Sequence, residues 1–140
     1  MSKFEVLNEK ALAVAHSPET YSNCAGTAFY IVGLTENDRP LTMRKALKHL
    51  DEIEDVEEGS VFVMFGEGVL GTRFLRKPIH FGVVASLDPL KVHHRRGEGR
   101  AFERSVPFSE VLCIYQTSRE TRFYAPVYDK ELYLDCLPDA

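Results

Sequence analysis

The sequence predicts an α+β fold in one domain, with N-terminal helices packed on an antiparallel β-sheet. Apolar residues follow helical spacing in the first part of the chain, whereas short apolar runs divided by glycine, proline and polar residues begin at Ser60. Helices that come first and strands that follow are typical of α+β architectures. A chain of 140 residues suits a single domain, 1–140, because it buries roughly two thirds of the surface that its unfolded form exposes.

Two helices are expected before the strands, and a helix or an irregular lead-in is expected before both of them. Residues 1–16 combine helix-forming residues with spaced apolar ones, and a Ser-Pro pair follows them. Residues 23–34 are apolar nearly all round, which predicts a buried helix with Asn23 as its N-cap and Cys24 in its first turn. Apolar residues at spacings near three and four predict an amphipathic helix over 41–53.

The second part of the chain is expected to form an antiparallel meander. Polar residues, glycine and proline separate its apolar runs, as they do between consecutive strands of such sheets. The predicted strands are SVFVMF, PIHFGVVAS, KVHHRR, AFERSVPF, EVLCIYQ and FYAPVYDKELYL.

The composition excludes fibrous and disordered chains and argues against a protein that coats nucleic acid. A hydrophobic fraction of 44% and a charged fraction of 27% are ordinary for a globular protein. A net charge of −4 is opposite in sign to the excess of nucleic-acid-binding domains, so no nucleic acid partner is predicted. Charges interrupt the apolar residues of 1–15, which predicts neither a signal peptide nor a membrane span and places the chain, as synthesised, in the cytoplasm.

The three cysteines lie far apart without a CxxC pair, which favours reduced thiols over a disulfide framework. Cys113 lies inside an apolar run and is expected in the core, and Cys136 near the chain end is expected at the surface. Zinc is not predicted, because no two cysteines have ligand spacing and His93 and His94, adjacent on a strand, would face opposite ways.

Cys24 and His80 are the candidate pair for nucleophilic chemistry. The first turn of a helix favours a thiolate, because its unpaired N–H groups and the helix dipole stabilise negative charge there. His80 lies on a predicted central strand and is the natural general base, and Gly82 leaves room for a neighbouring group to approach. The predicted reaction is acyl transfer through a thioester, with a third polar group that orients the imidazole.

Four short blocks of the chain resemble, in order, the motifs of NlpC/P60 domains, a family of papain-like cysteine peptidases and amidases. The family shows an Asp-Cys-Ser-Gly helix start, a Pro-Gly-Asp-Leu-Val-Phe-Phe strand, a His-Val-Gly-Ile strand and an Ile-His-Ala strand followed by glycine. The corresponding blocks are Asn23-Cys24-Ala25-Gly26, Glu58-Gly59-Ser60-Val61-Phe62-Val63, His80-Phe81-Gly82-Val83-Val84 and Val92-His93-His94-Arg95-Arg96-Gly97. The resemblance covers about 21–107.

The resemblance implies a papain-like core, in which a helix with the cysteine packs on a sheet with the histidines, without metal or cofactor. It assigns the nucleophile to Cys24, the base to His80 and the third polar residue to His93, with His94 as the alternative. Many members cut peptide bonds in bacterial cell-wall stem peptides, which implies a peptide or peptidoglycan fragment as substrate. Such a substrate lies outside the membrane, so either delivery by a phage or secretion system or a cytoplasmic substrate is expected.

The chain also departs from the family pattern. Asn23, Ala25 and Ser60 stand where Asp, Ser and Asp are usual, so any help from those side chains is altered. The segment 66–78 is longer than a tight turn and is predicted to form an insertion at the rim of the cleft.

Basic residues near the predicted third catalytic residue form either a solvated loop face or a site for anionic groups of the substrate. They are Lys91, Arg95, Arg96, Arg100 and Arg104. Because arginine pairs bidentately with carboxylates, Arg95 and Arg96 are candidate substrate-binding residues, together with Tyr21 just before the nucleophile.

Two other functions remain open within the same fold. An acyltransferase or thioesterase acting on lipid or small-molecule esters would use an apolar rim. The residues expected to form that rim are Phe65, Val69, Leu70 and Phe74. A binding or structural module without activity, in a phage tail or an effector, is the other alternative.

Overall fold

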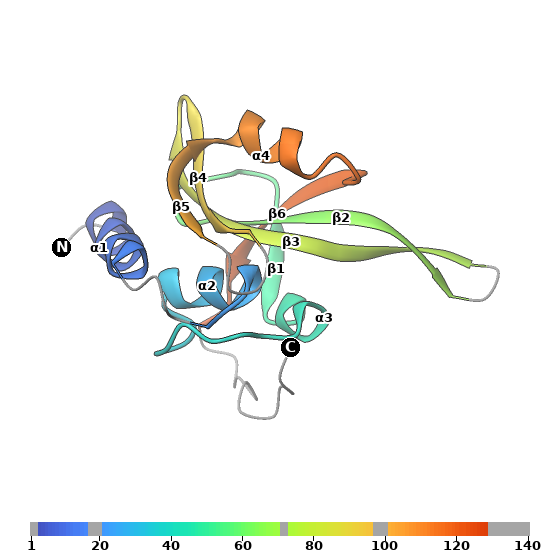
Figure 1. The fold of residues 1–140 in the computed structure, drawn as a ribbon, viewed down its shortest axis with the longest axis horizontal. Helices are drawn as coiled ribbons and strands as arrows, with labels where there is room; N and C mark the ends of the chain where they lie inside the picture. The colour runs from blue at the N-terminus through green and yellow to red at the C-terminus, as the bar shows by residue number, and fades with distance from the viewer. Residues whose placement is uncertain (1–2, 17–20, 71–72, 97–100, 129–140) are drawn as a thin grey trace.

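A six-stranded antiparallel sheet forms the centre of the molecule, with helices on both of its sides (Figure 1). The computed structural model describes residues 3–16, 21–70, 73–96 and 101–128. The strands are β1 (Leu50–Ile53), β2 (Val61–Leu70), β3 (Arg73–Leu87), β4 (Leu90–Arg95), β5 (Phe102–Pro107) and β6 (Glu120–Pro126), in the spatial order β1-β6-β2-β3-β4-β5. The helices are α1 (Lys3–Ala15), α2 (Cys24–Ile31), α3 (Met43–Leu47) and α4 (Phe108–Ile114). The predicted α+β class, with an antiparallel sheet, is confirmed.

The helix α2 forms as its sequence predicts and supplies one side of the main core. Asn23 is its N-cap, and the side-chain oxygen accepts a hydrogen bond from the Gly26 N–H at 2.8 Å. The Asn23 amide also donates to the Leu41 carbonyl at 2.8 Å, which a carboxylate cannot do. A Cβ at Gly26 would lie 1.7 Å from the Arg39 carbonyl oxygen, so only glycine fits this close approach.

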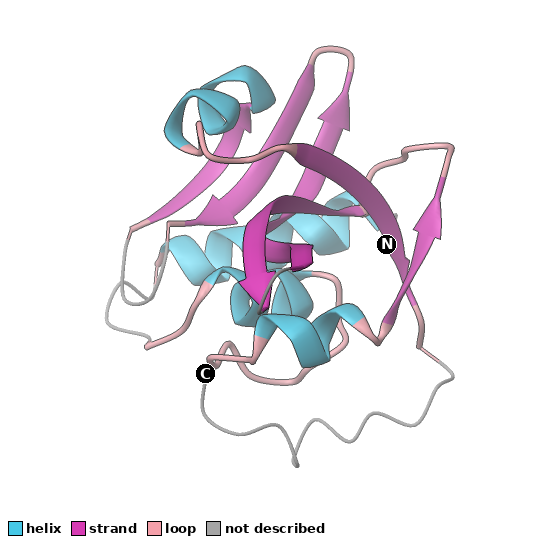
Figure 2. Cartoon of the chain, turned by 90° about the vertical axis from the view of Figure 1, so that its right-hand side faces the viewer, coloured by secondary structure: helices cyan, strands magenta, loops and turns pink. Residues whose placement is uncertain are grey.

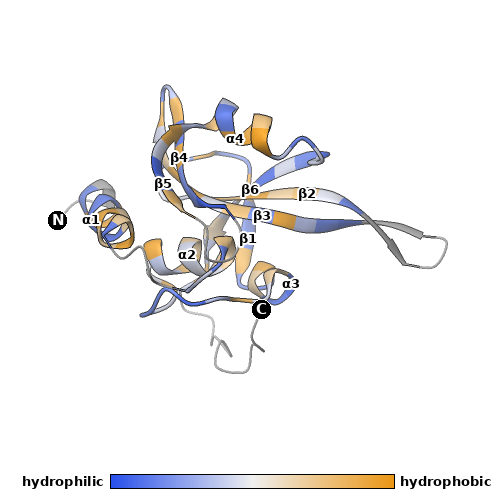
Figure 3. Ribbon diagram, in the orientation of Figure 1, coloured by the Kyte–Doolittle hydropathy of each residue, from blue (hydrophilic) through white to orange (hydrophobic). Residues whose placement is uncertain are grey.

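Two apolar clusters lie on opposite sides of the sheet. The larger joins α1 and α2 to alternate residues of β2 and β3, including Val63 and Phe81. The smaller lies beneath α4 and contains Phe62 and Met64 from the other face of β2. Figure 2 shows the helices and the sheet from the side, and Figure 3 shows that α1 has one apolar side and one polar side. The sheet is therefore buried on both faces at its central strands β2 and β3.

Two predicted elements are wrong. The helix expected over 41–53 ends at Leu47, and Leu50–Ile53 is the strand β1, which pairs with β6. The run EVLCIYQ, expected as a strand, lies mostly in α4, whose only buried residue is Val111. Cys113, expected in the core, is exposed on this helix. Cys136 lies outside the described residues.

Residues 66–70 and 73–78, expected within an insertion at the rim, continue the hairpin strands β2 and β3. Their pairing runs from Val61 and Val83 to Leu70 and Arg73, with a bulge next to Phe65. The hairpin extends away from the rest of the molecule (Figure 1). Phe65, expected in an apolar rim, is buried at the base of this hairpin. The side chains of the other three expected rim residues lie outside those described. None of the described helices is long and apolar enough to cross a bilayer.

Candidate active site

The Cys24 thiol lies where the first turn of α2 meets α3 and the middle of β3. The residue is buried, with 5% of its surface exposed. Its sulfur lies 3.7 Å from Met43 Sδ, and Met43 is partly buried on α3. The backbone N–H of Phe81, which follows His80 in the chain, also interacts with the thiol.

A gap between β3 and β4 gives the thiol access to this N–H. Among the described residues, the pairing of the two strands extends from Leu87 and Leu90 to Val83 and His93 and no further. Phe81 lies two residues beyond that point, so β4 does not pair with it, although it remains paired with Val63 of β2. The beginning of α2 lies against this position and supplies the sulfur as an alternative acceptor.

His80 lies at the centre of a buried aromatic and imidazole cluster. Its Nε2 is 2.9 Å from Nδ1 of His94 on the neighbouring strand. Its Nδ1 is buried and has no hydrogen-bond partner in the structure. The Tyr115 ring stacks on the His80 ring, with centroids 3.9 Å apart and planes at 17°. Tyr115 also interacts electrostatically with Cys24. Within the described part of the chain, the structure gives no direct hydrogen bond between the Cys24 thiol and the His80 ring, so Tyr115 is the residue that links them.

The structure brings His94, not His93, to His80. Successive residues of a strand face opposite sides, so only one of the two imidazoles points toward His80. His93 instead accepts a hydrogen bond at Nδ1 from the Ser105 N–H at 3.0 Å. His93 was the first choice for the third residue, and the geometry favours the alternative.

Glu103 is a further member of the cluster that the sequence did not indicate. Its Oε1 lies 3.3 Å from Nε2 of His94. The same oxygen accepts a hydrogen bond from Arg96 Nε at 2.5 Å. His80, His94 and Glu103 therefore form a continuous series across β3, β4 and β5, and Cys24 lies near it on α2, beside Phe81.

Burial keeps the thiol and the imidazole neutral in this state. It raises the pKa of Cys24 to about 11, although the N–H groups of Phe81, Ala25 and Cys24 itself lower it. The expectation that the helix start lowers this pKa is therefore wrong, because desolvation outweighs the N–H groups. Burial, and secondarily His94, lowers the pKa of His80 to about 2. At neutral pH the proton stays on the sulfur.

Arg95 holds α2 and β4 together and is not open to a substrate. It is 2% exposed, its Nε donates to Thr27 Oγ1 at 2.8 Å, and its Nη2 donates to Asp38 Oδ2 at 3.2 Å. The Thr27 hydroxyl donates in turn to the other Asp38 oxygen at 2.8 Å. A substrate-binding role for Arg95 is therefore not supported, because its guanidinium already serves an internal ion pair.

Replacing Arg95 with methionine is expected to lower the free energy of unfolding by about 3–5 kcal/mol. Methionine keeps much of the volume but leaves the Asp38 carboxylate, 9% exposed, without its cation. Urea unfolding followed by circular dichroism measures the change. The matched control is Arg119→Met, which removes an exposed pair with Glu67 and should alter stability little. Equal stability of the Arg95 variant and the native chain would contradict the assignment.

The other two predicted substrate-binding residues lie at the surface. The Arg96 side chain is 48% exposed next to Glu103. Tyr21 is 61% exposed and precedes α2 by three residues. Both positions are compatible with contact to a bound substrate, and neither residue belongs to the buried cluster.

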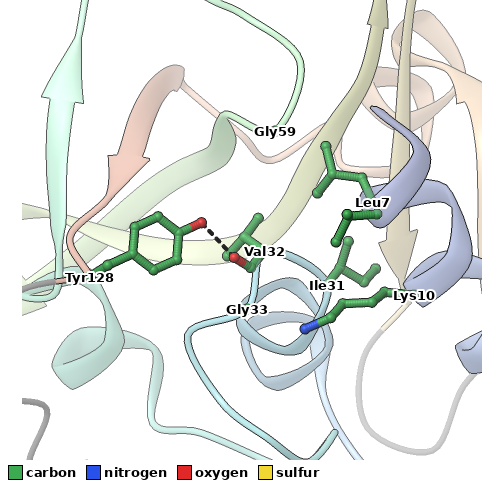
Figure 4. Close-up of a pocket in the computed structure, with 8 residues that line it drawn as sticks. Leu7, Lys10, Ile31, Val32, Gly33, Gly59 and Tyr128 are labelled. Carbon is green, nitrogen blue, oxygen red and sulfur yellow. Dashed lines mark hydrogen bonds between the residues drawn. The ribbon is translucent and has the colours of Figure 1, made fainter. Parts of the chain in front are cut away.

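A separate cavity lies at the other end of α2. Its volume is about 200 Å³, and its lining includes Leu7 and Lys10 of α1, the Ile31–Gly33 segment and Tyr128 (Figure 4). The Tyr128 hydroxyl donates to the Val32 carbonyl at its edge. Cys24 lies at the opposite end of the eight-residue helix, about 10 Å away along its axis. This cavity is thus not part of the cysteine cluster. Within the described ranges, no group of three or more acidic, histidine or cysteine side chains forms a metal site.

No family model matches the chain, and no curated protein or solved structure matches it. The resemblance to NlpC/P60 domains therefore stays a prediction from four short blocks. Any function must be argued from the arrangement of Cys24, His80 and His94.

Proposed function

We propose that this protein is a cysteine hydrolase that cleaves an amide bond, with Cys24 as nucleophile, His80 as general base and His94 as the partner that orients His80. One observation carries the proposal. His80 is held at Nε2 by His94 and has a free Nδ1, while the Cys24 thiol interacts with the N–H of the next residue, Phe81. General-base activation of a thiol requires a base that is held on one nitrogen and free on the other, and the proposal requires that free Nδ1 to reach the Cys24 sulfur when the substrate is bound.

The proposed reaction has two steps. In the first, the Cys24 sulfur bonds to the amide carbonyl carbon as its proton passes to His80 Nδ1. The C–N bond then breaks, the amine leaves with that proton, and a thioester remains. In the second, water attacks the thioester as His80 takes its proton and returns it to the sulfur, which releases a carboxylic acid. The oxyanion of both steps would meet the Cys24 backbone N–H.

The neutral state of the pair determines when the proton moves. A thiol with a pKa near 11 and an imidazole with a pKa near 2 hold no preformed thiolate at pH 7. The proton therefore transfers during the attack, when the developing thiolate and imidazolium attract each other within the buried site. The Cys24 thiol is buried against Met43, so the substrate must displace this side chain to reach the sulfur.

The substrate class of the proposal follows the NlpC/P60 resemblance. An antiparallel sheet with His80 and His94 on neighbouring strands, covered by a helix that begins with Cys24, is compatible with a papain-like core. A stem peptide of peptidoglycan carries free carboxylates. The half-exposed Arg96 lies beside the cluster and suits such a group.

Digestion of purified peptidoglycan tests the proposal. The native chain should release fragments with newly formed peptide termini, detected by mass spectrometry, and Cys24→Ala should release none because the nucleophile is gone. Cys113→Ala is the matched control, since it removes the other free thiol described, which is exposed on α4. It should cleave as the native chain does. Turnover by Cys24→Ala at the native level would refute the proposal.

A binding or structural module is the second candidate, favoured by the burial of Cys24 and by its raised pKa. Covalent trapping separates the candidates. Labelling of Cys24 by a peptide-like electrophile supports the amide hydrolase, and labelling only by a lipid-like electrophile indicates an enzyme acting on esters. If neither labels the folded chain at pH 8, while both label it in urea, the module is favoured.

A further inference from the structure

We infer that Glu103 is a positioning residue that acts through His94 to leave the Nδ1 of His80 without a proton. The inference rests on the proposed function, because it explains how His80 is kept ready to accept the proton of Cys24. Three features support it: the acceptor at Glu103, the direction of the imidazole contacts and a bulge in β5.

The Glu103 carboxylate fixes one end of the series. Carboxylate oxygens only accept hydrogen bonds, and Oε1 lies 3.3 Å from Nε2 of His94, close enough to attract a proton on that nitrogen although the two atoms are not aligned as a hydrogen bond in this conformation. The tautomer of His94 with its proton on Nε2 is therefore favoured, and its Nδ1 becomes an acceptor. Arg96 donates to the same Oε1, which keeps the oxygen in place.

The tautomer of His94 in turn determines the tautomer of His80. His94 Nδ1 lies 2.9 Å from His80 Nε2, so an acceptor at His94 requires the donor, and hence the proton, on Nε2 of His80. Burial lowers the pKa of both rings, so each is neutral and carries only one proton. His80 Nδ1 then has a free lone pair. In the opposite tautomers Nδ1 would carry the proton and His80 could not act as a base.

A bulge in β5 places Glu103 opposite His94. Val92 pairs with Val106, whereas His94 pairs with Glu103, so that two residues of β5 oppose one of β4. Ser105, in this extra stretch, has a φ of 52°, a backbone conformation that is uncommon for residues other than glycine. His93 accepts the Ser105 N–H and so supports the bulge.

The bulge matters because the next residue of β5 has the opposite chemistry. In a regular ladder continuing the Val92–Val106 register, His94 would face Arg104. A guanidinium only donates hydrogen bonds, so it would favour the tautomers that place a proton on His80 Nδ1. One extra residue in β5 thus decides between a carboxylate and a guanidinium beside His94.

The test replaces the hydrogen-bond acceptor at position 103 with a donor and measures the tautomers of the two rings directly. Histidine-selective ¹⁵N NMR of the full chain distinguishes bare from protonated ring nitrogens, and His80→Gln and His94→Gln assign the signals. The native chain should show bare Nδ1 on both rings. Glu103→Lys, which offers only a donor, should move the proton of both rings to Nδ1 and lower kcat by about 10²- to 10⁴-fold, with little change in KM.

Three further variants make the result specific. Glu103→Gln should keep the native tautomers and most of the activity, because Arg96 holds the amide oxygen toward His94. Glu103→Leu lacks an acceptor without adding a charge, and it should give a mixture of tautomers if the lysine variant does not fold. Glu110→Lys makes the same change of charge at an exposed site on α4 and should change neither readout.

The outcomes separate this inference from the proposed function. Native tautomers in both Glu103→Lys and Glu103→Leu would overturn the role of Glu103, whatever the activity. A reversal of tautomers in a chain that cleaves no amide would support the role of Glu103 and refute the hydrolase.

Discussion

Replacement of His80 by glutamine is expected to lower kcat/KM for an amide substrate by about 10²- to 10⁴-fold, the usual contribution of a general base. Glutamine fills most of the imidazole volume but cannot take a proton from Cys24. The loss should appear in kcat, because His80 is fully buried and does not form the binding surface. Initial rates over a range of substrate concentrations measure both constants.

The control for this variant is another buried histidine. His49 is 8% exposed and lies next to β1, outside the cysteine cluster. His49→Gln makes the same chemical change, and its kcat should stay within about threefold of the native value if the effect at His80 is chemical. A His80→Gln variant as active as His49→Gln, while Cys24→Ala is inactive, would show that His80 is not the base.

The second large effect is a steep loss of stability in acid. Burial lowers the pKa of His80 to about 2 and that of His93 to about 4, from an ordinary value of 6.5. Between pH 6.5 and 4 the unfolded chain binds protons at these positions that the folded chain does not, so stability falls as the pH falls. Each group should contribute about 1.4 kcal/mol per pH unit. The pKa of His94 is also lowered, and adds in the same direction.

Between pH 6.5 and 4.5 the free energy of unfolding should fall by about 5 kcal/mol through His80 and His93 together. That loss equals the whole stability of a marginal domain. Urea unfolding at a series of pH values measures it, and His80→Gln should reduce the slope by about 1.4 kcal/mol per pH unit. Above pH 9 the sign reverses, because the unfolded Cys24 thiol ionises near 9.0 and the folded one near 11. Constant stability between pH 6.5 and 4.5 would contradict the burial of neutral imidazoles.

The elements that the sequence predicted correctly depend on local signals. The beginning of α2 was predictable because Asn23 caps the helix and the apolar run follows it directly. The strand β1 was not, because Leu50 pairs with Pro126, far away in the chain, and its apolar spacing also fits a helix. The run that forms α4 contains residues typical of strands, yet Leu112 and Ile114 are exposed, so its apolar residues indicated a core contact that most of them do not make.

The candidate site was predictable only in part. Cys24 and His80 could be selected because a cysteine at a helix start and a histidine on a central strand are visible locally. The choice of His94 over His93 depends on which face of β4 meets His80. Glu103 reaches His94 through a shift of one residue in β5 that no local pattern marks. Arg95 belongs to the interior because Asp38, 57 residues away in the chain, neutralises it.

Burial of the Cys24 thiol against Met43 affects the apparent affinity for a substrate. A ligand that binds only uncovered molecules has an apparent Kd equal to its intrinsic Kd divided by the uncovered fraction. If about one molecule in 100 is uncovered at a given moment, binding is weakened about 100-fold, or by roughly 2.7 kcal/mol. A smaller side chain at Met43 would then strengthen binding without a single added contact, simply by making the receptive population more common.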